Sequence, residues 1–352
     1  MNGSEKYSFH LRGPTRLKAV DWNNVNHRRS IIASLVQGVY AQEYDRQQRL
    51  KEPRAPPLAP PWWEFFDFQL YCVLSDQVDT SVFGAVYEKC NSYDSASNAP
   101  KYVFAFRGNF ISESTIIRDL KLDVECCFNK LNSDDARFVI GMNKVKEMVN
   151  ISGGAPNMWL AGHSLGAAMA LSAGKNMAML NHSIETYLYS PPFPSLTEIL
   201  TKWTKCTEKT QDKIHIAKSF VKATLVAAAQ ASNKAQHDPF SALYDWHPNL
   251  FVNRGDLICS GYIAYFEHRN RMECIGAGII EKFATQTSTK TIFTNSVSSG
   301  TTLPRGAEGL HLLPLANLYI NTKNTPKPLQ AHAHEQWWNP DTDCELKEYH
   351  YN

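Results

Sequence analysis

The stretch Met158–Leu171, MWLAGHSLGAAMAL, decides the fold of this chain. It opens with an apolar run typical of a buried strand, passes through a Gly-x-Ser-x-Gly motif at Gly162 to Gly166, and ends in small residues that favour a closely packed helix. A serine on a sharp strand-to-helix turn needs small residues on either side, because the turn crowds the backbone. We therefore predict that Ser164 is a nucleophile on such an elbow; a purely structural turn is the alternative.

The segments on either side of this stretch alternate between strand and helix patterns. Alternation of this kind indicates a mostly parallel sheet with helices on both faces. The predicted fold class is α/β, of the α/β-hydrolase type, with a single domain over residues 1–352. Strands are predicted at 68–74 and 82–87, as an antiparallel pair, and at 102–106, 158–161, 186–189, 250–253 and 311–320; helices are predicted at 114–128, 135–149, 165–179 and 263–285.

Two segments depart from this alternation. Residues 1–66 read as an N-terminal helical and Pro/Trp-rich extension, with a helix over 27–49 that the prolines of 53–61 end. The aromatic cluster at 62–66 is interpreted as packing on the core, since large aromatics contribute strongly to burial; contact with lipid is the alternative. Residues 191–248 are predicted to form a helical cap insertion over the strand ends, with a helical layer that never moves as the alternative.

Composition restricts the classes of function. The 36 Lys and Arg residues nearly balance the 34 Asp and Glu residues, which argues against nucleic acid as a partner and against a polybasic membrane anchor. The first residues lack the apolar core of a secretory signal, and no apolar run approaches the roughly 18 residues of a membrane span. We predict an intracellular, cytoplasmic protein. The eight cysteines have no zinc-ligand spacing and are predicted to be reduced and mostly buried.

A serine nucleophile needs a histidine to remove its proton and a carboxylate to orient that histidine. In folds with this elbow, the acid follows the serine along the chain and the histidine comes last. Asp256 lies just past the predicted strand 250–253 and is the preferred acid. Asp238 and Asp245 are the alternatives, although both belong to the predicted insertion.

The histidine is harder to assign, because several follow Asp256. His332 and His334 come after the last predicted strand and a loop, which suits a general base, and His332 is preferred. His334 stays open as an alternative, and so does His311, which is more easily interpreted as a core residue. The remaining two, His268 and His350, lie in a charged helical run and at the end of the sequence.

Three segments together resemble the class 3 lipases, the family that includes fungal triacylglycerol lipases and many plant lipases. FAFRGN at Phe104–Asn109 resembles the strand of that family that ends in F-R-G-T. Gly162 to Gly166 matches its G-H-S-L-G elbow, and Val252–Ile258 resembles its N-x-x-D-x-[IV] loop. Asp21-Trp22, PPWWEFF at 60–66 and HEQWW at 334–338 are more closely similar to a plant subgroup often labelled GDSL esterase/lipase, although Gly-Asp-Ser-Leu does not occur here.

The resemblance implies acyl-ester hydrolysis by Ser164, Asp256 and a histidine in an H-x-x-E-x-aromatic stretch, which favours His332. It also implies an oxyanion hole made by the backbone amides of Leu165 and Asn109, where the family usually has threonine at the second position. No metal or cofactor is expected. The expected substrate is a small acyl ester or a lipid, with peripheral lipid contact and no transmembrane segment. A lipase-like signalling scaffold without turnover and an acyltransferase are the alternatives.

Overall fold

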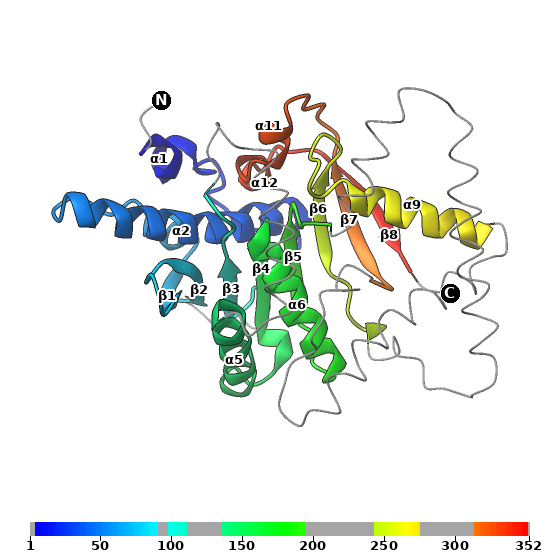
Figure 1. Cartoon of the computed structure of the whole chain (residues 1–352), viewed down its shortest axis with the longest axis horizontal. Coiled ribbons are helices and arrows are strands. Elements are labelled where there is room, and N and C mark those ends of the chain that lie inside the picture. Colours follow the sequence, from blue (N-terminus) through cyan, green and yellow to red (C-terminus); the bar gives the residue numbers. More distant parts are fainter. Residues whose placement is uncertain (1–3, 91–97, 111–135, 194–242, 275–312, 351–352) are drawn as a thin grey trace.

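The computed structural model describes residues 4–90, 98–110, 136–193, 243–274 and 313–350 (Figure 1). These residues form one mixed α/β arrangement around a single sheet. Its elements are η1 (Glu5–Tyr7), α1 (Phe9–Arg12), α2 (Val25–Lys51), α3 (Pro61–Glu64), β1 (Phe68–Ser75), β2 (Val82–Lys89), β3 (Tyr102–Phe106), α5 (Ala136–Ile151), η2 (Ala155–Asn157), β4 (Met158–His163), α6 (Leu165–Met179), β5 (Glu185–Tyr189), β6 (Asn249–Asn253), α9 (Gly261–Cys274), β7 (Ala316–Asn321), α11 (Pro328–His332), α12 (Glu335–Trp338) and β8 (Cys344–Tyr349).

The sheet has eight strands in the described residues, and they lie side by side in chain order from β1 to β8. The strands from β3 to β7 pair in parallel, whereas β1, β2 and β8 pair antiparallel at the two edges. Because parallel strands all end at the same edge, the loops after β3, β4, β6 and β7 meet there. The predicted α/β class and the antiparallel pair β1 and β2 are confirmed.

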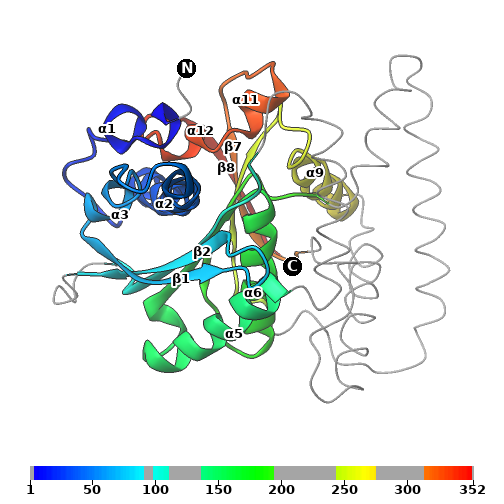
Figure 2. The ribbon, with the colours of Figure 1, turned by 60° about the vertical axis from the view of Figure 1, so that its left-hand side comes forward.

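Each face of the sheet carries its own apolar core. Helices α1, α2, α3 and α12 cover one face, and α5, α6 and α9 cover the other (Figure 2). Strand β4 shows why both layers form, because its side chains alternate between them. Met158 and Leu160 pack in the core with α5 and α6, and Trp159 and Ala161 pack in the core with α2. A strand buried on both sides is continuously apolar, as the sequence of β4 is.

Helix α2 crosses one face of the sheet and ties the N-terminal part of the chain to the C-terminal part. The side chain of Asn24 caps its first turn by accepting hydrogen bonds from the amides of Asn26 and His27. Farther along, the buried guanidinium of Arg29 donates to the carbonyls of Asn339 and Thr342, at 2.9 and 2.8 Å. The predicted N-terminal extension thus packs directly on the sheet; the division of the chain into domains stays a prediction.

The aromatic cluster after the prolines packs in the core, as its sequence predicts. Trp62, Trp63 and Phe66 are buried, and the Trp62 indole donates to the carbonyl of Tyr7 at 2.7 Å. Phe65 is the exposed member of the cluster.

The structure corrects the predicted segments around the last strands. Strand β7 begins at Ala316 and not at 311, because Pro314 has no amide hydrogen for the ladder. The stretch after β7, for which only a loop was predicted, contains the short helices α11 and α12. Strand β8 was not predicted. The predicted helix at 114–128, and the predicted helical cap 191–248 apart from its two ends, lie outside the described residues.

The structure describes the side chains of four of the eight cysteines, and all four are free thiols. Cys259 is buried, Cys72 and Cys344 are partly exposed, and Cys90 is exposed. The prediction of buried thiols is therefore confirmed for Cys259 and wrong for the other three, which lie in or directly after the antiparallel strands β1, β2 and β8. Within the described ranges, no helix has both the length and the apolar character needed to span a bilayer.

Candidate active site

Ser164 lies on the sharp turn between β4 and α6, as predicted. Its backbone has φ 56° and ψ −124°, a left-handed conformation that side chains rarely adopt. The neighbouring glycines explain how the turn is possible. A Cβ atom on Gly162 would lie 2.1 Å from the carbonyl oxygen of Gly166, and one on Gly166 would lie 2.3 Å from that of Phe106. Both glycines are therefore required by close backbone contact.

The structure brings the three side chains of the predicted site together in one hydrogen-bonded row. Nε2 of His332 lies 3.0 Å from Oγ of Ser164, and Nδ1 lies 2.9 Å from Oδ2 of Asp256. All three residues are buried. They come from the segments that follow β4, β6 and β7, which meet at the carboxyl edge of the sheet, and His332 is the last residue of α11.

The carboxylate of Asp256 accepts hydrogen bonds from three donors. The amide of Ile258 donates to Oδ1 at 2.9 Å. Oδ2 accepts from Nδ1 of His332 and from the Cys259 thiol, which lies 3.0 Å away. Cys259 was not predicted from the sequence, because a lone cysteine in the turn before α9 carries no motif. Burial, together with the adjacent Asp256 charge, raises the pKa of this thiol well above its usual value. Cys259 therefore stays protonated and acts as a donor.

His334 lies two residues from His332 but points to a different partner. Its Nε2 lies 2.9 Å from the carbonyl oxygen of Ala33 in α2, and burial lowers the pKa of this imidazole to about 3. The two side chains point to different partners because the segment folds into α11 and α12 with a turn between them. His311, the third candidate base, lies outside the described residues.

A single amide holds the backbone on either side of His332. Nε2 of Gln336 donates to the carbonyls of Ala331 and Ala333, at 2.7 and 2.9 Å. Its Oε1 accepts from the side-chain amides of Asn253 and Asn321, each at 2.8 Å. These two asparagines are partners at the ends of β6 and β7, so the amide ties the sheet to the His332 segment. A polar residue next to two tryptophans was the signal that could have identified Gln336.

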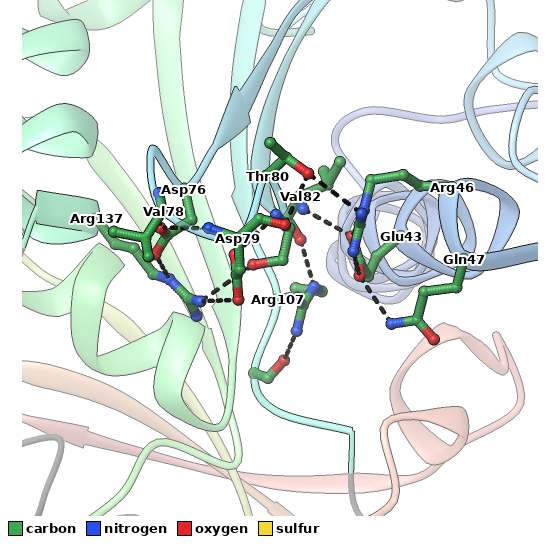
Figure 3. Close-up of polar contacts among 12 residues, drawn as sticks. Glu43, Arg46, Gln47, Asp76, Val78, Asp79, Thr80, Val82, Arg107 and Arg137 are labelled. Atoms are coloured by element: carbon green, nitrogen blue, oxygen red, sulfur yellow. Dashed lines mark hydrogen bonds and ion pairs between the residues drawn. The ribbon is translucent and has the colours of Figure 1, made fainter. Parts of the chain in front are cut away.

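The loop after β3 is fixed by the arginine of its FRG motif. The buried guanidinium of Arg107 donates to the carbonyl of Val82 through Nε and to that of Gly108 at 2.7 Å. Glu43 accepts from the amide of Val82 at 2.7 Å, which joins this contact to α2 (Figure 3). Burial lowers the pKa of Arg107. Its bonds to two backbone carbonyls fix the conformation of the loop after β3.

The two predicted oxyanion donors are next in sequence to residues at the nucleophile. Leu165 is the first residue of α6, so its amide has no carbonyl one turn earlier in the helix to bond. Asn109 directly follows Gly108, which passes so close to the nucleophile that an added Cβ would lie 2.8 Å from Cβ of Ser164. Among the described residues, no three His, Cys, Asp or Glu side chains gather as metal ligands.

The other two predicted acids are not part of this row. Asp245 is exposed, and its carbonyl accepts from the hydroxyl of Ser183. Asp238 lies outside the described residues.

No protein-family profile matches the chain. The chain is 39% identical, over 368 aligned positions, to a protein of Arabidopsis thaliana named GDSL esterase/lipase, and the match covers 99% of each sequence. The Gly-Asp-Ser-Leu string in that name has no counterpart in this sequence, where the serine stands in Gly-His-Ser-Leu-Gly. A match of this identity over the full length establishes kinship, and the chain belongs to the plant GDSL esterase/lipase family to which that name is given.

Proposed function

We propose that this protein is a serine esterase or lipase with an α/β-hydrolase fold, which hydrolyses carboxylic esters through a Ser164, His332 and Asp256 triad. The observation that carries the proposal is the row of hydrogen bonds from Oγ of Ser164 to Nε2 of His332 and from Nδ1 to Asp256. The esterase/lipase name of the Arabidopsis relative supports it. The FRG, GHSLG and acid-loop segments support the narrower assignment to the class 3 lipase type.

The chemistry follows from which atom can donate and which can accept. Because Asp256 is an acceptor for Nδ1, the imidazole carries its proton on that nitrogen and leaves Nε2 free to accept. Nε2 then takes the proton of Ser164 as Oγ attacks the ester carbonyl. The same proton passes to the leaving alcohol, an acyl-enzyme remains, and water repeats the sequence to release the acid.

The negative oxygen that forms during each attack needs donors. The amide of Leu165 at the start of α6 is one, and the helix N-terminus adds a favourable electrostatic field. The amide of Asn109 is the other, and replacement of the family threonine by asparagine leaves this backbone group in place. An active enzyme is thus compatible with the departure from F-R-G-T.

The substrate class is an acyl ester of a small molecule or a lipid, with peripheral contact to lipid. Purified protein should hydrolyse p-nitrophenyl esters, assayed from acetate to long acyl chains. Saturable hydrolysis that fluorophosphonate treatment removes supports the proposal. Folded protein with no hydrolysis at any chain length would instead favour the scaffold without turnover. Acyltransfer to an added alcohol would identify the acyltransferase.

The substitution Asp256→Asn is expected to lower kcat by roughly 10⁴-fold while the protein stays folded. If the amide nitrogen takes the place of Oδ2, it faces Nδ1 of His332, and the imidazole must turn its proton toward Ser164. If it takes the place of Oδ1, it faces the amide of Ile258. The first orientation leaves Nε2 unable to accept the serine proton, and the second sets one donor against another.

The matched control is Asp245→Asn, which removes the same charge from an exposed position outside the row. It should retain the wild-type kcat on the same ester. Wild-type turnover by Asp256→Asn, or a comparable loss in Asp245→Asn, would contradict the assignment of the acid.

A further inference from the structure

A tyrosine of α2 bonds to the oxyanion loop and to the histidine of the nucleophile motif. The hydroxyl of Tyr40 accepts from the amide of Gly108 at 2.8 Å and lies 2.9 Å from Nδ1 of His163. On the other side of its ring, Nε2 of His163 lies 3.0 Å from the carbonyl oxygen of His332. One continuous chain of hydrogen bonds therefore joins the loop carrying Asn109 to the backbone of the proposed base.

The two ends of this chain define its direction. The amide of Gly108 can only donate, and the carbonyl of His332 can only accept, so Nε2 of His163 carries a hydrogen. In a neutral imidazole Nδ1 is then an acceptor, and it takes the hydrogen of the Tyr40 hydroxyl. Every donor in the chain thus has one acceptor.

The protonation states that this direction requires agree with the surroundings. Burial, followed by the nearby His334 and His332, lowers the pKa of His163 well below its usual value, so its ring is neutral. Burial raises the pKa of Tyr40, so its hydroxyl keeps the hydrogen that it donates.

Gly108 is tightly packed between Tyr40 and Ser164. A Cβ atom there would lie 2.9 Å from the Tyr40 hydroxyl and 2.8 Å from Cβ of Ser164. Only glycine lets the loop pass between the helix and the nucleophile. Its carbonyl is bonded to Arg107 at 2.7 Å, so both polar groups of this residue are held before the chain reaches Asn109.

We propose that Tyr40 and His163 are positioning residues. Together they hold the oxyanion loop and the backbone of His332 at fixed positions relative to each other. The proposal rests on the proposed function, since it assigns a role in the same ester hydrolysis. Neither side chain needs to touch the substrate: Tyr40 acts through the amide of Gly108, and His163 acts through the carbonyl of His332. The N-terminal helix α2 thereby becomes part of the catalytic apparatus.

The first test is Tyr40→Phe, which removes only the hydroxyl and keeps the ring against Phe110, His163 and His334. We expect kcat on a p-nitrophenyl ester to fall by about 10-fold to 100-fold, because small displacements of catalytic groups cost this much. KM should change less than about twofold, since the oxyanion exists only after attack and the loss falls on the transition state.

The matched control is Tyr87→Phe. Tyr87 is another fully buried tyrosine packed against α2, and its hydroxyl accepts from Gln42 of that helix at 3.2 Å. Both variants lose one buried hydroxyl, so their unfolding midpoints should fall by similar amounts. Only Tyr40→Phe should lose kcat. Equal kcat in the two variants would overturn the proposal, because the effect would then be one of stability alone.

A second variant tests whether the two residues form one chain. His163→Gln keeps a side-chain N–H for the His332 carbonyl and lacks the ring acceptor for Tyr40. If the chain acts as a unit, the double variant loses less kcat than the product of the two single losses. Single losses that multiply would show independent action and would overturn the proposal.

Failure of this proposal can be told from failure of the proposed function in the same assay. An active wild type with an equally active Tyr40→Phe overturns the positioning role alone. A wild type that neither hydrolyses esters nor reacts with a fluorophosphonate overturns the proposed function, and the positioning role with it.

Discussion

Ser164→Ala is expected to reduce ester hydrolysis by on the order of 10⁶-fold, because the proposed triad acts as a unit and has no other nucleophile. The variant should fold normally. Alanine keeps the Cβ atom of serine, so the strain at φ 56° is unchanged, and the hydroxyl makes no cap to α6. Initial rates on one p-nitrophenyl ester, with unfolding midpoints of both proteins, measure the effect.

A control comes from another serine that ends a strand with positive φ. Ser190 follows β5 with φ 46°, and its hydroxyl accepts from the indole of Trp337. Ser190→Ala should lose stability and keep most of its kcat. Hydrolysis by Ser164→Ala at a rate near that of the wild type would remove Ser164 from the mechanism.

The second large effect is expected at His332. His332→Ala should reduce kcat by about 10⁶-fold, since an unassisted serine has no acceptor for its proton. Reaction with a fluorophosphonate should be lost together with hydrolysis. The imidazole contacts both Ser164 and Asp256, and no other described histidine does so.

His334→Ala is the matched comparison, because it removes the same side chain two residues away. His334 bonds to the carbonyl of Ala33 and packs against His163 at a ring-centroid distance of 4.5 Å. We expect it to lower the unfolding midpoint while costing less than about tenfold in kcat, which corresponds to roughly 1.4 kcal/mol of positioning. The opposite ranking of the two variants would assign the base to His334.

Local patterns predicted much of the fold. Helix α6 and strand β3 have the predicted bounds. The apolar run before a glycine favours a buried strand for β3, and the run of small residues favours a closely packed helix for α6. The position of Asp256 after one strand, and that of His332 after another together with the resemblance to class 3 lipases, selected two residues that the structure places in one hydrogen-bonded row with Ser164. These predictions succeed because residues near each other in the sequence determine them.

Other parts depend on contacts between distant segments. Strand β8 lies at a solvated edge, so its charged sequence lacks the apolar alternation that marks a strand. The roles of Gln336 and Tyr40 depend on partners far along the chain, and a single sequence does not display such pairings. The helix start at α11 did have a local signal, because Pro328 occupies its first position. The intracellular location remains a prediction.

The most direct test of the proposed triad is to map the residue that a fluorophosphonate modifies in the wild-type protein. After one equivalent of probe has reacted, peptide mass spectrometry should find the adduct on Ser164, and hydrolysis of p-nitrophenyl esters should be lost in proportion to labelling. An adduct on another residue, or full hydrolysis after stoichiometric labelling, would contradict the assignment of Ser164 as the nucleophile.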